Sequence, residues 1–207
     1  MTPLKKLAQK FRYGLTLQSI RLKLMKAGIE FTPYIIFREG TNVTDIPVIN
    51  GNADEYSTVM LGPEHMRAMS EIDAGFSEAD LLSQLDNGQK CIGIIHRDSI
   101  VAYMWMNFRE LSYKATLINL KNNEAYLWNM YTKESYRGRN LAPYLRYKSY
   151  EMLKEMGRDV IYSISDSFNS PAIKFKEKLN AEKVKHILYF KLFKCKARGF
   201  VIKSWKH

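Results

Sequence analysis

The chain has 207 residues, of which 46% are hydrophobic and 13% aromatic, and this content excludes a largely disordered protein. Two cysteines in a chain of this length exclude a disulfide scaffold, and we expect Cys91 and Cys195 to be reduced thiols in a cytosolic protein. The net charge of +11 is uneven, because residues 1–30 hold seven basic and one acidic residue and residues 137–207 hold seventeen and six.

The first predicted element is a basic amphipathic helix over residues 3–27, with Gly28 as its end. Such a helix can pack on its own domain, pack on a second subunit of a homodimer, or make peripheral contact with an anionic membrane. No apolar run is long enough to span a bilayer, and lysines interrupt the place where a signal peptide needs an apolar core.

The middle of the chain alternates strands, a loop and short helices. Strands are expected over residues 34–37 and 56–61, and the polar residues 41–54 between them form a loop. A helix begins at Pro63, and a second follows Ser77, whose partner Asp80 completes a capping box. We expect residues 1–54 to form an N-terminal extension and residues 55–207 to form the main domain.

Longer strands follow, beginning with a hairpin of residues 90–96 and 100–107. Further strands are expected over residues 124–132, 160–165, 184–193 and 200–205, and helices over residues 141–156 and 171–179. The order predicts a mixed α/β (α+β) fold, with a mostly antiparallel central sheet of about seven strands flanked by helices and at least one crossover.

The residues that connect strand 124–132 to the next helix carry the clearest chemical signal. The turn reads Arg137-Gly138-Arg139-Asn140-Leu141-Ala142, directly at a helix N-terminus. Successive backbone N–H groups and the helix dipole favour an anion there, and the two arginines add positive charge suited to a pyrophosphate. Gly138 lets the backbone approach a ligand closely.

This turn resembles the acyl-CoA loop of the GNAT superfamily of N-acetyltransferases, which reads Arg/Gln-x-x-Gly-x-Gly/Ala. The fourth position, usually glycine, is Asn140, the best replacement if that residue needs a positive φ. A second run, from Asn169 to Leu179, looks like the family's Asn-x-x-Ala-x-x-x-Tyr-x-Lys-Leu segment. The resemblance covers roughly residues 55–193 and implies a GNAT-like acyl-CoA-binding fold.

The resemblance also implies roles for residues around the cofactor, acetyl-CoA or another acyl-CoA. In that fold the strand before the loop splays from its neighbour, and the pantetheine arm lies in the gap. Backbone groups of Met130, Tyr131 and Thr132 would bond this arm and polarise the thioester carbonyl. The loop, Arg137 to Ala142, would hold the pyrophosphate, while Asn169 would cap the next helix and touch the cofactor side.

The proton donor and the general base are less clear from the sequence. The family's usual tyrosine aligns with Lys176, which can protonate the thiolate if its pKa is lowered. The alternatives for Lys176 are a solvated helix residue or a partner of the CoA 3′-phosphate. Tyr126 and Trp128 occupy the inward positions where the family often has a base, and they would shape an apolar or ring-binding pocket. Glu124 is the nearest carboxylate on the same face, with a surface position as its alternative.

The sequence therefore predicts a cytoplasmic acyl-CoA-dependent N-acyltransferase that transfers acetyl from acetyl-CoA to a primary amine of a small molecule. One alternative is a longer-chain acyltransferase, with acyl-CoA or an acyl carrier protein as donor, acting near the membrane on a lipid or cell-envelope precursor. Another is a non-catalytic module that binds acyl-CoA. We expect no metal site and no nucleic-acid partner, since neither ligand spacing nor an aromatic–basic platform motif is present.

Overall fold

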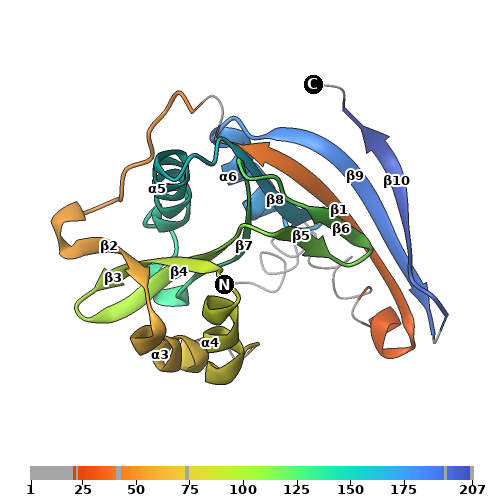
Figure 1. The fold of residues 1–207 in the computed structure, drawn as a ribbon, viewed down its shortest axis with the longest axis horizontal. Helices are drawn as coiled ribbons and strands as arrows, with labels where there is room; N and C mark the ends of the chain where they lie inside the picture. Colours follow the sequence, from red (N-terminus) through yellow and green to blue (C-terminus); the bar gives the residue numbers. More distant parts are fainter. Residues whose placement is uncertain (1–20, 22, 41–42, 73–74, 194, 206–207) are drawn as a thin grey trace, which may run out of the picture.

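The computed structural model describes residues 21, 23–40, 43–72, 75–193 and 195–205. Eight strands form one twisted sheet (Figure 1). Their bounds are β1 Ile29–Glu39, β2 Tyr56–Leu61, β3 Lys90–His96, β4 Ser99–Asn107, β7 Glu124–Thr132, β8 Val160–Asp166, β9 Glu182–Leu192 and β10 Arg198–Ser204. They lie in the order β10-β9-β1-β8-β7-β4-β3-β2. All neighbours are antiparallel except β7 and β8, which are parallel, so the mixed, mostly antiparallel sheet is confirmed.

The first described strand is longer than predicted and lies inside the sheet. β1 pairs with β8 on one side and with β9 on the other, although we had expected a strand only over residues 34–37. Most of the helix predicted over residues 3–27 lies outside the described residues. Residues 23–26 are helical, and Gly28 ends this turn with a φ of 83°. The division of the chain at residue 54 stays a prediction.

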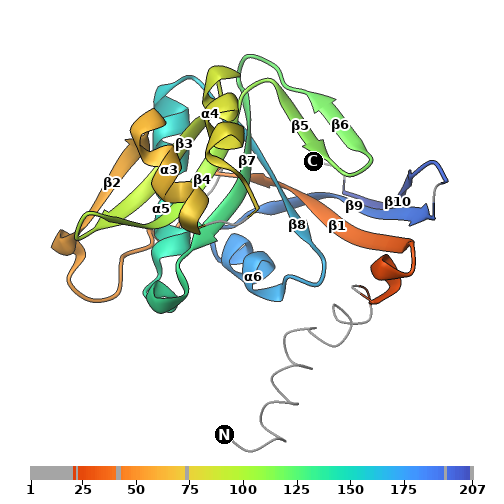
Figure 2. The ribbon, with the colours of Figure 1, turned by 90° about the horizontal axis from the view of Figure 1, so that it is seen from below.

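Helices cover both faces of the sheet. The helices are α3 Met66–Ile72, α4 Glu78–Asp86, α5 Leu141–Glu155 and α6 Ser170–Lys178, with the 3-10 turns η1 Ala53–Glu55, η2 Pro63–His65 and η3 Glu134–Tyr136. Figures 1 and 2 show α5 on one side of β3 and β4, and α3 and α4 on the other. The predicted capping box is confirmed, because Ser77 Oγ accepts from Asp80 N at 3.2 Å and Asp80 Oδ2 accepts from Ser77 N at 2.9 Å.

Alternate residues of the hairpin β3–β4 feed two separate cores, as the strand period of two requires. Ile92, Met104 and Met106 pack toward α5, whereas Cys91 and Trp105 pack toward α3 and α4. Since both faces of these strands are covered, the sequence there is a nearly continuous apolar run. This doubly covered half of the sheet is the rigid base on which the candidate site is built.

The structure also contains a small second sheet, which the sequence did not predict. β5 Glu110–Tyr113 and β6 Thr116–Asn119 form a two-stranded hairpin. Its turn carries a lysine with a φ of 54° at Lys114 instead of the usual glycine or asparagine, so the usual turn signal is absent. The hairpin is tied to β1 by a 2.6 Å hydrogen bond between the Tyr34 and Thr116 hydroxyls.

Candidate active site

The two parallel strands β7 and β8 separate halfway along their length. Residues Glu124–Leu127 pair with Val160–Ser163, and the ladder ends there. Beyond this point the strands enclose a cavity of about 690 Å³ that reaches from the loop before α5 to the β5–β6 hairpin. Its walls include Met130, Tyr131, Thr132, Arg137, Ala142, Asn169 and Lys176. Seven of the residues singled out from the sequence thus come together around one cavity.

A β-bulge in β7 sits at the point where the strands separate. Trp128 pairs with Trp105, and Tyr131 pairs with Tyr103. Two residues of β7 therefore lie between these pairs where β4 has one, which is the definition of a bulge. Asn129, between them, has a φ of 43°. The extra residue changes the alternation of the backbone after Trp128, and the peptide groups of residues 129–131 border the cavity. The family resemblance implies cofactor contact by residues 130–132, but no local signal in the sequence indicates the bulge.

The loop before α5 has the backbone shape that an anion site needs. Gly138 has a φ of 83° and Asn140 a φ of 63°, so both lie in the left-handed region. Asn140 therefore occupies the conformation expected for the family's glycine. A Cβ atom on Gly138 would meet nothing within 4 Å, so its φ, and not crowding, favours glycine there.

Asn50, in the predicted 41–54 loop, holds this turn through hydrogen bonds to its carbonyl groups. Asn50 N donates to Arg139 O at 3.0 Å, and Asn50 Nδ2 donates to Gly138 O at 3.1 Å. The C=O and N–H groups of one peptide point in opposite directions. The N–H groups of Arg139 and Asn140 therefore point away from the Asn50 groups that donate to this turn. A depression of about 270 Å³, which Asn50 also lines, lies against this loop and the start of α5.

The two arginines of this loop, Arg139 and Arg137, make different contacts. Arg139 Nη1 donates to the Tyr56 hydroxyl at 2.8 Å, and its guanidinium lies 4.7 Å from the centre of the Tyr136 ring. Arg137 is exposed; its Nε donates to Thr132 O at 3.4 Å, and its Nη1 lies 3.9 Å from Glu134 Oε1. Arg139 thus braces the loop against neighbouring aromatic rings, while Arg137 is the loop arginine that lines the cavity.

A buried histidine at the end of β3 supports the same loop. His96 Nε2 bonds to Glu55 Oε2 at 2.9 Å, and its Nδ1 bonds to the Tyr136 hydroxyl at 3.0 Å. Tyr136 belongs to η3, directly before the loop. This chain of bonds fixes η3 to the β3–β4 hairpin; sequence spacing could not reveal it, because the three residues are far apart in the chain.

Lys176 is buried, which excludes the solvated alternative considered for it. Its Nζ donates to Ser163 Oγ at 2.6 Å and to Ile164 O at 3.1 Å, and lies 3.5 Å from Glu39 Oε1. The Ser163 hydroxyl in turn donates to Glu39. Burial, helped by the like charge of Arg146 and opposed by Glu39, lowers the pKa of Lys176 to about 7. A lysine with this pKa can exchange a proton near neutral pH.

Glu39 and Arg146 complete the buried cluster, and neither was singled out from the sequence. Burial raises the pKa of Glu39, but the charges of Arg146 and Lys176 and the hydrogen bonds from Ser163 and Tyr150 outweigh it and lower that pKa. Arg146 Nε lies 3.6 Å from Glu39 Oε2. Among the described residues, Arg146 Nε and Nη1 have no hydrogen-bond partner, although the residue lines the cavity.

Of the other residues considered from the sequence, Trp128 also lines the cavity, whereas Glu124 and Tyr126 do not. Asn169 caps α6, because its Oδ1 accepts from Ala172 N at 3.2 Å, and it lines the cavity as expected. Glu124 accepts from Lys121 N at 2.9 Å in the paired half of β7. Tyr126 is packed in a core with Tyr34 and Ile187, and burial raises its pKa. Neither Glu124 nor Tyr126 lines the cavity.

Comparison with known proteins identifies the family. Residues 54–181 match the family model of the acetyltransferase (GNAT) family. A GNAT-family acetyltransferase from Novosphingobium aromaticivorans is 18% identical, with a TM-score of 0.58 over 82% of this chain and 69% of its own. One from Colwellia psychrerythraea is also 18% identical, with a TM-score of 0.57 over 78% of this chain and 57% of its own.

The aminoglycoside N-acetyltransferase AAC(6')-Iy, in complex with CoA, is 12% identical, with a TM-score of 0.50 over 61% of this chain and 88% of its own. A search of curated proteins finds no match. The family match covers more than half of the chain, which therefore belongs to the GNAT family of acetyltransferases. It is an acyltransferase, and acetyl-CoA is the donor that this family uses.

The residues of the cavity fit acetyl-CoA on grounds of chemistry. The loop offers N–H groups at a helix N-terminus for a pyrophosphate. The gap between β7 and β8 presents backbone groups along its length, as the amides of pantetheine require. Arg146 Nη1 adds a buried donor without a hydrogen-bond partner among the described residues, which a carbonyl oxygen would satisfy.

Proposed function

We propose that this chain transfers an acetyl group from acetyl-CoA to the primary amine of a small molecule, and that Lys176 protonates the departing sulfur. The observation that carries the proposal is the position of Lys176, which is buried at the cavity between the separated strands. It occupies the place in the second motif where the family usually has a tyrosine. The lysine therefore replaces the phenolic proton donor with an ammonium group.

The chain holds the donor through its backbone more than through charged side chains. The N–H groups of residues 139–142 receive the pyrophosphate, Arg137 adds a cation at the mouth, and residues 130–132 bond the pantetheine arm. Bound acetyl-CoA supplies an activated thioester whose sulfur leaves as a thiolate. A backbone N–H beside the bulge donates to the thioester oxygen, where negative charge develops.

The surroundings of Lys176 allow it to donate a proton and then to be protonated again. Ser163 and Ile164 accept hydrogen bonds from the ammonium, and Glu39 balances its charge. Because burial lowers its pKa to about 7, the ammonium releases a proton to a thiolate far more readily than an exposed lysine does. After the transfer the neutral amine regains a proton from water.

The acceptor loses its proton to water in this proposal, since β7 provides no base at the cavity. Of the described residues that line the cavity, Asp166 is the one carboxylate. Its Oδ2 is paired with Arg21 and its Oδ1 accepts from Phe168 N at 3.0 Å. Asp166 is therefore engaged in holding the turn between β8 and α6, and rate enhancement comes mainly from positioning.

Aromatic side chains at the far end of the cavity favour an amine with an apolar or ring-bearing body. Tyr113 from the β5–β6 hairpin and Trp128 lie there, Tyr131 lines the cavity nearer the loop, and Trp128 is fixed by a 2.8 Å bond from Nε1 to Gln89 Oε1. The Trp128 ring also contacts Phe76, next to the acidic start of α4. Negative charge on that side suits a cationic amine.

A screen of amines that follows the release of free CoA tests the proposal. We expect turnover with acetyl-CoA and at least one small primary amine, and stabilisation of the fold by acetyl-CoA in a thermal-shift assay. A parallel series with palmitoyl-CoA tests the longer-chain alternative. Stabilisation by acetyl-CoA without turnover of any amine would contradict the acceptor class, and the absence of stabilisation by either thioester would contradict the cofactor site.

A further inference from the structure

The β9–β10 hairpin carries a concentration of exposed apolar side chains that the acetyltransferase site does not use. Thirteen large hydrophobic side chains are exposed among the described residues, and six of them belong to this hairpin: Phe190, Leu192, Phe193, Phe200, Val201 and Ile202. Every residue of β10 is exposed, although β10 pairs with β9 along its length. An apolar concentration of this kind marks an interaction surface.

The strand register places part of this set on one face. Phe200 lies opposite Leu188, and Leu188, Phe190 and Leu192 alternate along β9, so the four side chains share a face. A register shift between Val201 and Lys203 inserts Ile202 as an extra residue. Val201 is on the opposite face, so apolar groups surround the edge of the strand. This arrangement suits an environment, such as the interfacial region of a lipid bilayer, that surrounds an inserted strand edge on both faces.

The same hairpin is strongly basic. Residues 182–204 hold seven lysines and arginines and one acidic residue, Glu182. Lys191, Lys196, Arg198 and Lys203 are exposed beside the apolar side chains. Figures 1 and 2 show this end of the sheet extending away from the helices that cover the site. Apolar residues flanked by cations are the combination that an anionic lipid surface attracts.

We propose that the β9–β10 hairpin is a docking surface for an anionic phospholipid bilayer. Phe200 and its neighbours enter the interface between headgroups and acyl chains, and the lysines and arginines contact the phosphates. Pairing of β10 with a second copy is disfavoured, because it would bring two strongly basic hairpins together. The aliphatic members of the set, Leu192, Val201 and Ile202, cannot stack on bases as an RNA surface requires.

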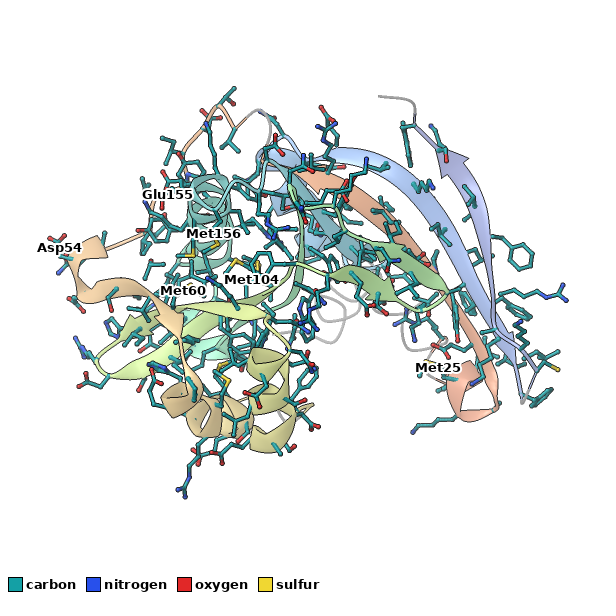
Figure 3. All side chains as sticks on the ribbon, viewed as in Figure 1. Met25, Asp54, Met60, Met104, Glu155 and Met156 are labelled. Atoms are coloured by element: carbon teal, nitrogen blue, oxygen red, sulfur yellow. The ribbon has the colours of Figure 1, made fainter. Side chains whose placement is uncertain are left out.

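The surface is separate in the chain from the basic helix predicted over residues 3–27, and all of its residues except Lys194 are among those that the structure describes. Met25, in the last described turn before β1, is itself exposed and lies at the same end of the sheet (Figure 3). Among the described residues no helix is long and apolar enough to cross a bilayer. The hairpin proposal concerns contact with one surface of a bilayer and does not depend on the proposed reaction.

Co-sedimentation of the full chain with vesicles tests the proposal. The vesicles contain equal parts of phosphatidylcholine and phosphatidylglycerol, or phosphatidylcholine alone. We expect binding to the anionic vesicles that weakens with added salt, and little binding to the neutral ones. The double variant Phe200→Ser with Ile202→Ser, and the double variant Lys196→Glu with Arg198→Glu, should each lower the partition coefficient about tenfold or more.

Variants at the other edge of the molecule provide the matched control. Met60 lies on β2, the opposite edge strand of the sheet, and Lys154 is an exposed residue of α5. Met60→Ser with Lys154→Glu makes the same kinds of change and should leave vesicle binding unchanged. Thermal stabilisation by acetyl-CoA shows that each variant is folded.

Three results would overturn the proposal. The first is wild-type binding to anionic vesicles that both hairpin variants retain, which would assign contact to another segment such as residues 3–27. The second is the absence of wild-type binding. The third is a dimer in light scattering, or binding of single-stranded RNA, that the Phe200→Ser and Ile202→Ser changes abolish while vesicle binding persists.

Discussion

The two halves of β7 differ in pairing and burial although they belong to one strand. Residues 124–127 are buried and pair with β8, and Tyr126 and Leu127 also pair with β4. Residues 128–132 are half-buried, pair only with β4 and border the cavity. The first half holds the sheet together, and the second exposes backbone groups to a ligand. Separation of two parallel strands thus leaves unpaired backbone groups beside a cavity, which is where we propose that the donor binds.

The largest expected effect follows from placing a negative charge at the open end of β7, where α5 begins. Ala142→Glu puts a carboxylate among the N–H groups that receive the pyrophosphate, and like charges repel. We expect the affinity for acetyl-CoA to fall about 100-fold or more, measured by calorimetric titration. Ala79→Glu places the same carboxylate at the start of α4 and should leave the affinity unchanged. Equal effects of the two changes would contradict the assignment of the loop.

Removal of the buried lysine should affect turnover more than binding. Lys176→Met keeps the length and apolar stem of the side chain but removes the proton donor. We expect kcat to fall about 100-fold, while the Kd for acetyl-CoA stays within about threefold. Lys178→Met, two residues along α6 at an exposed position, is the control and should have no effect on either quantity. A normal kcat in Lys176→Met would place the donor elsewhere.

A substitution beside the half of β7 that pairs with β8 should lower the stability of the fold and leave the activity unchanged. Ile161 is 3% exposed and pairs with Ala125 in the joined part of β7 and β8. Ile161→Ala should lower the free energy of unfolding by about 2–4 kcal/mol, measured in urea, with kcat per folded molecule preserved. Ile164→Ala, three residues further along β8 and beside the cavity, should cost less stability and change the KM for substrate. The opposite pattern would mean that the two halves are not functionally distinct.

The smallest effect is expected at the left-handed residue of the loop. Asn140→Gly keeps the positive φ without strain and loses only the 2.7 Å bond from Asn140 Nδ2 to Val48 O. The free energy of unfolding should change by less than about 1 kcal/mol, and affinity for acetyl-CoA by less than about threefold. Asn140→Val should reduce both more strongly, because a β-branched residue opposes this conformation. Indistinguishable glycine and valine variants would contradict the conformational explanation.

The sequence predicted the elements that have local signals. Ser77 with Asp80, and the turn from Arg137 to Ala142, were found because capping and loop residues lie close together in the chain. The β5–β6 hairpin was missed because its turn has no glycine, and Glu124 and Tyr126 were favoured because period-two alternation cannot show where β8 leaves β7.

The buried cluster could not have been found in this way. Glu39 and Lys176 lie at opposite ends of the chain and meet only because β1 pairs with β8 inside the sheet. The sequence offered Lys176 as a candidate through its place in the second motif, but its burial depends on packing between distant elements. Motifs therefore pointed to the proposed cofactor loop, whereas tertiary structure was needed to show the buried surroundings of the proposed proton donor.

The pH dependence of kcat tests the role of Lys176 most directly, with saturating acetyl-CoA and acceptor. Because the pKa of Lys176 lies near 7, its proton-donating form is lost as the pH rises above that value. The account predicts that wild-type kcat declines above about pH 7, and that this decline is absent from the residual activity of Lys176→Met and present in Lys178→Met. A decline that persists unchanged in Lys176→Met would contradict it.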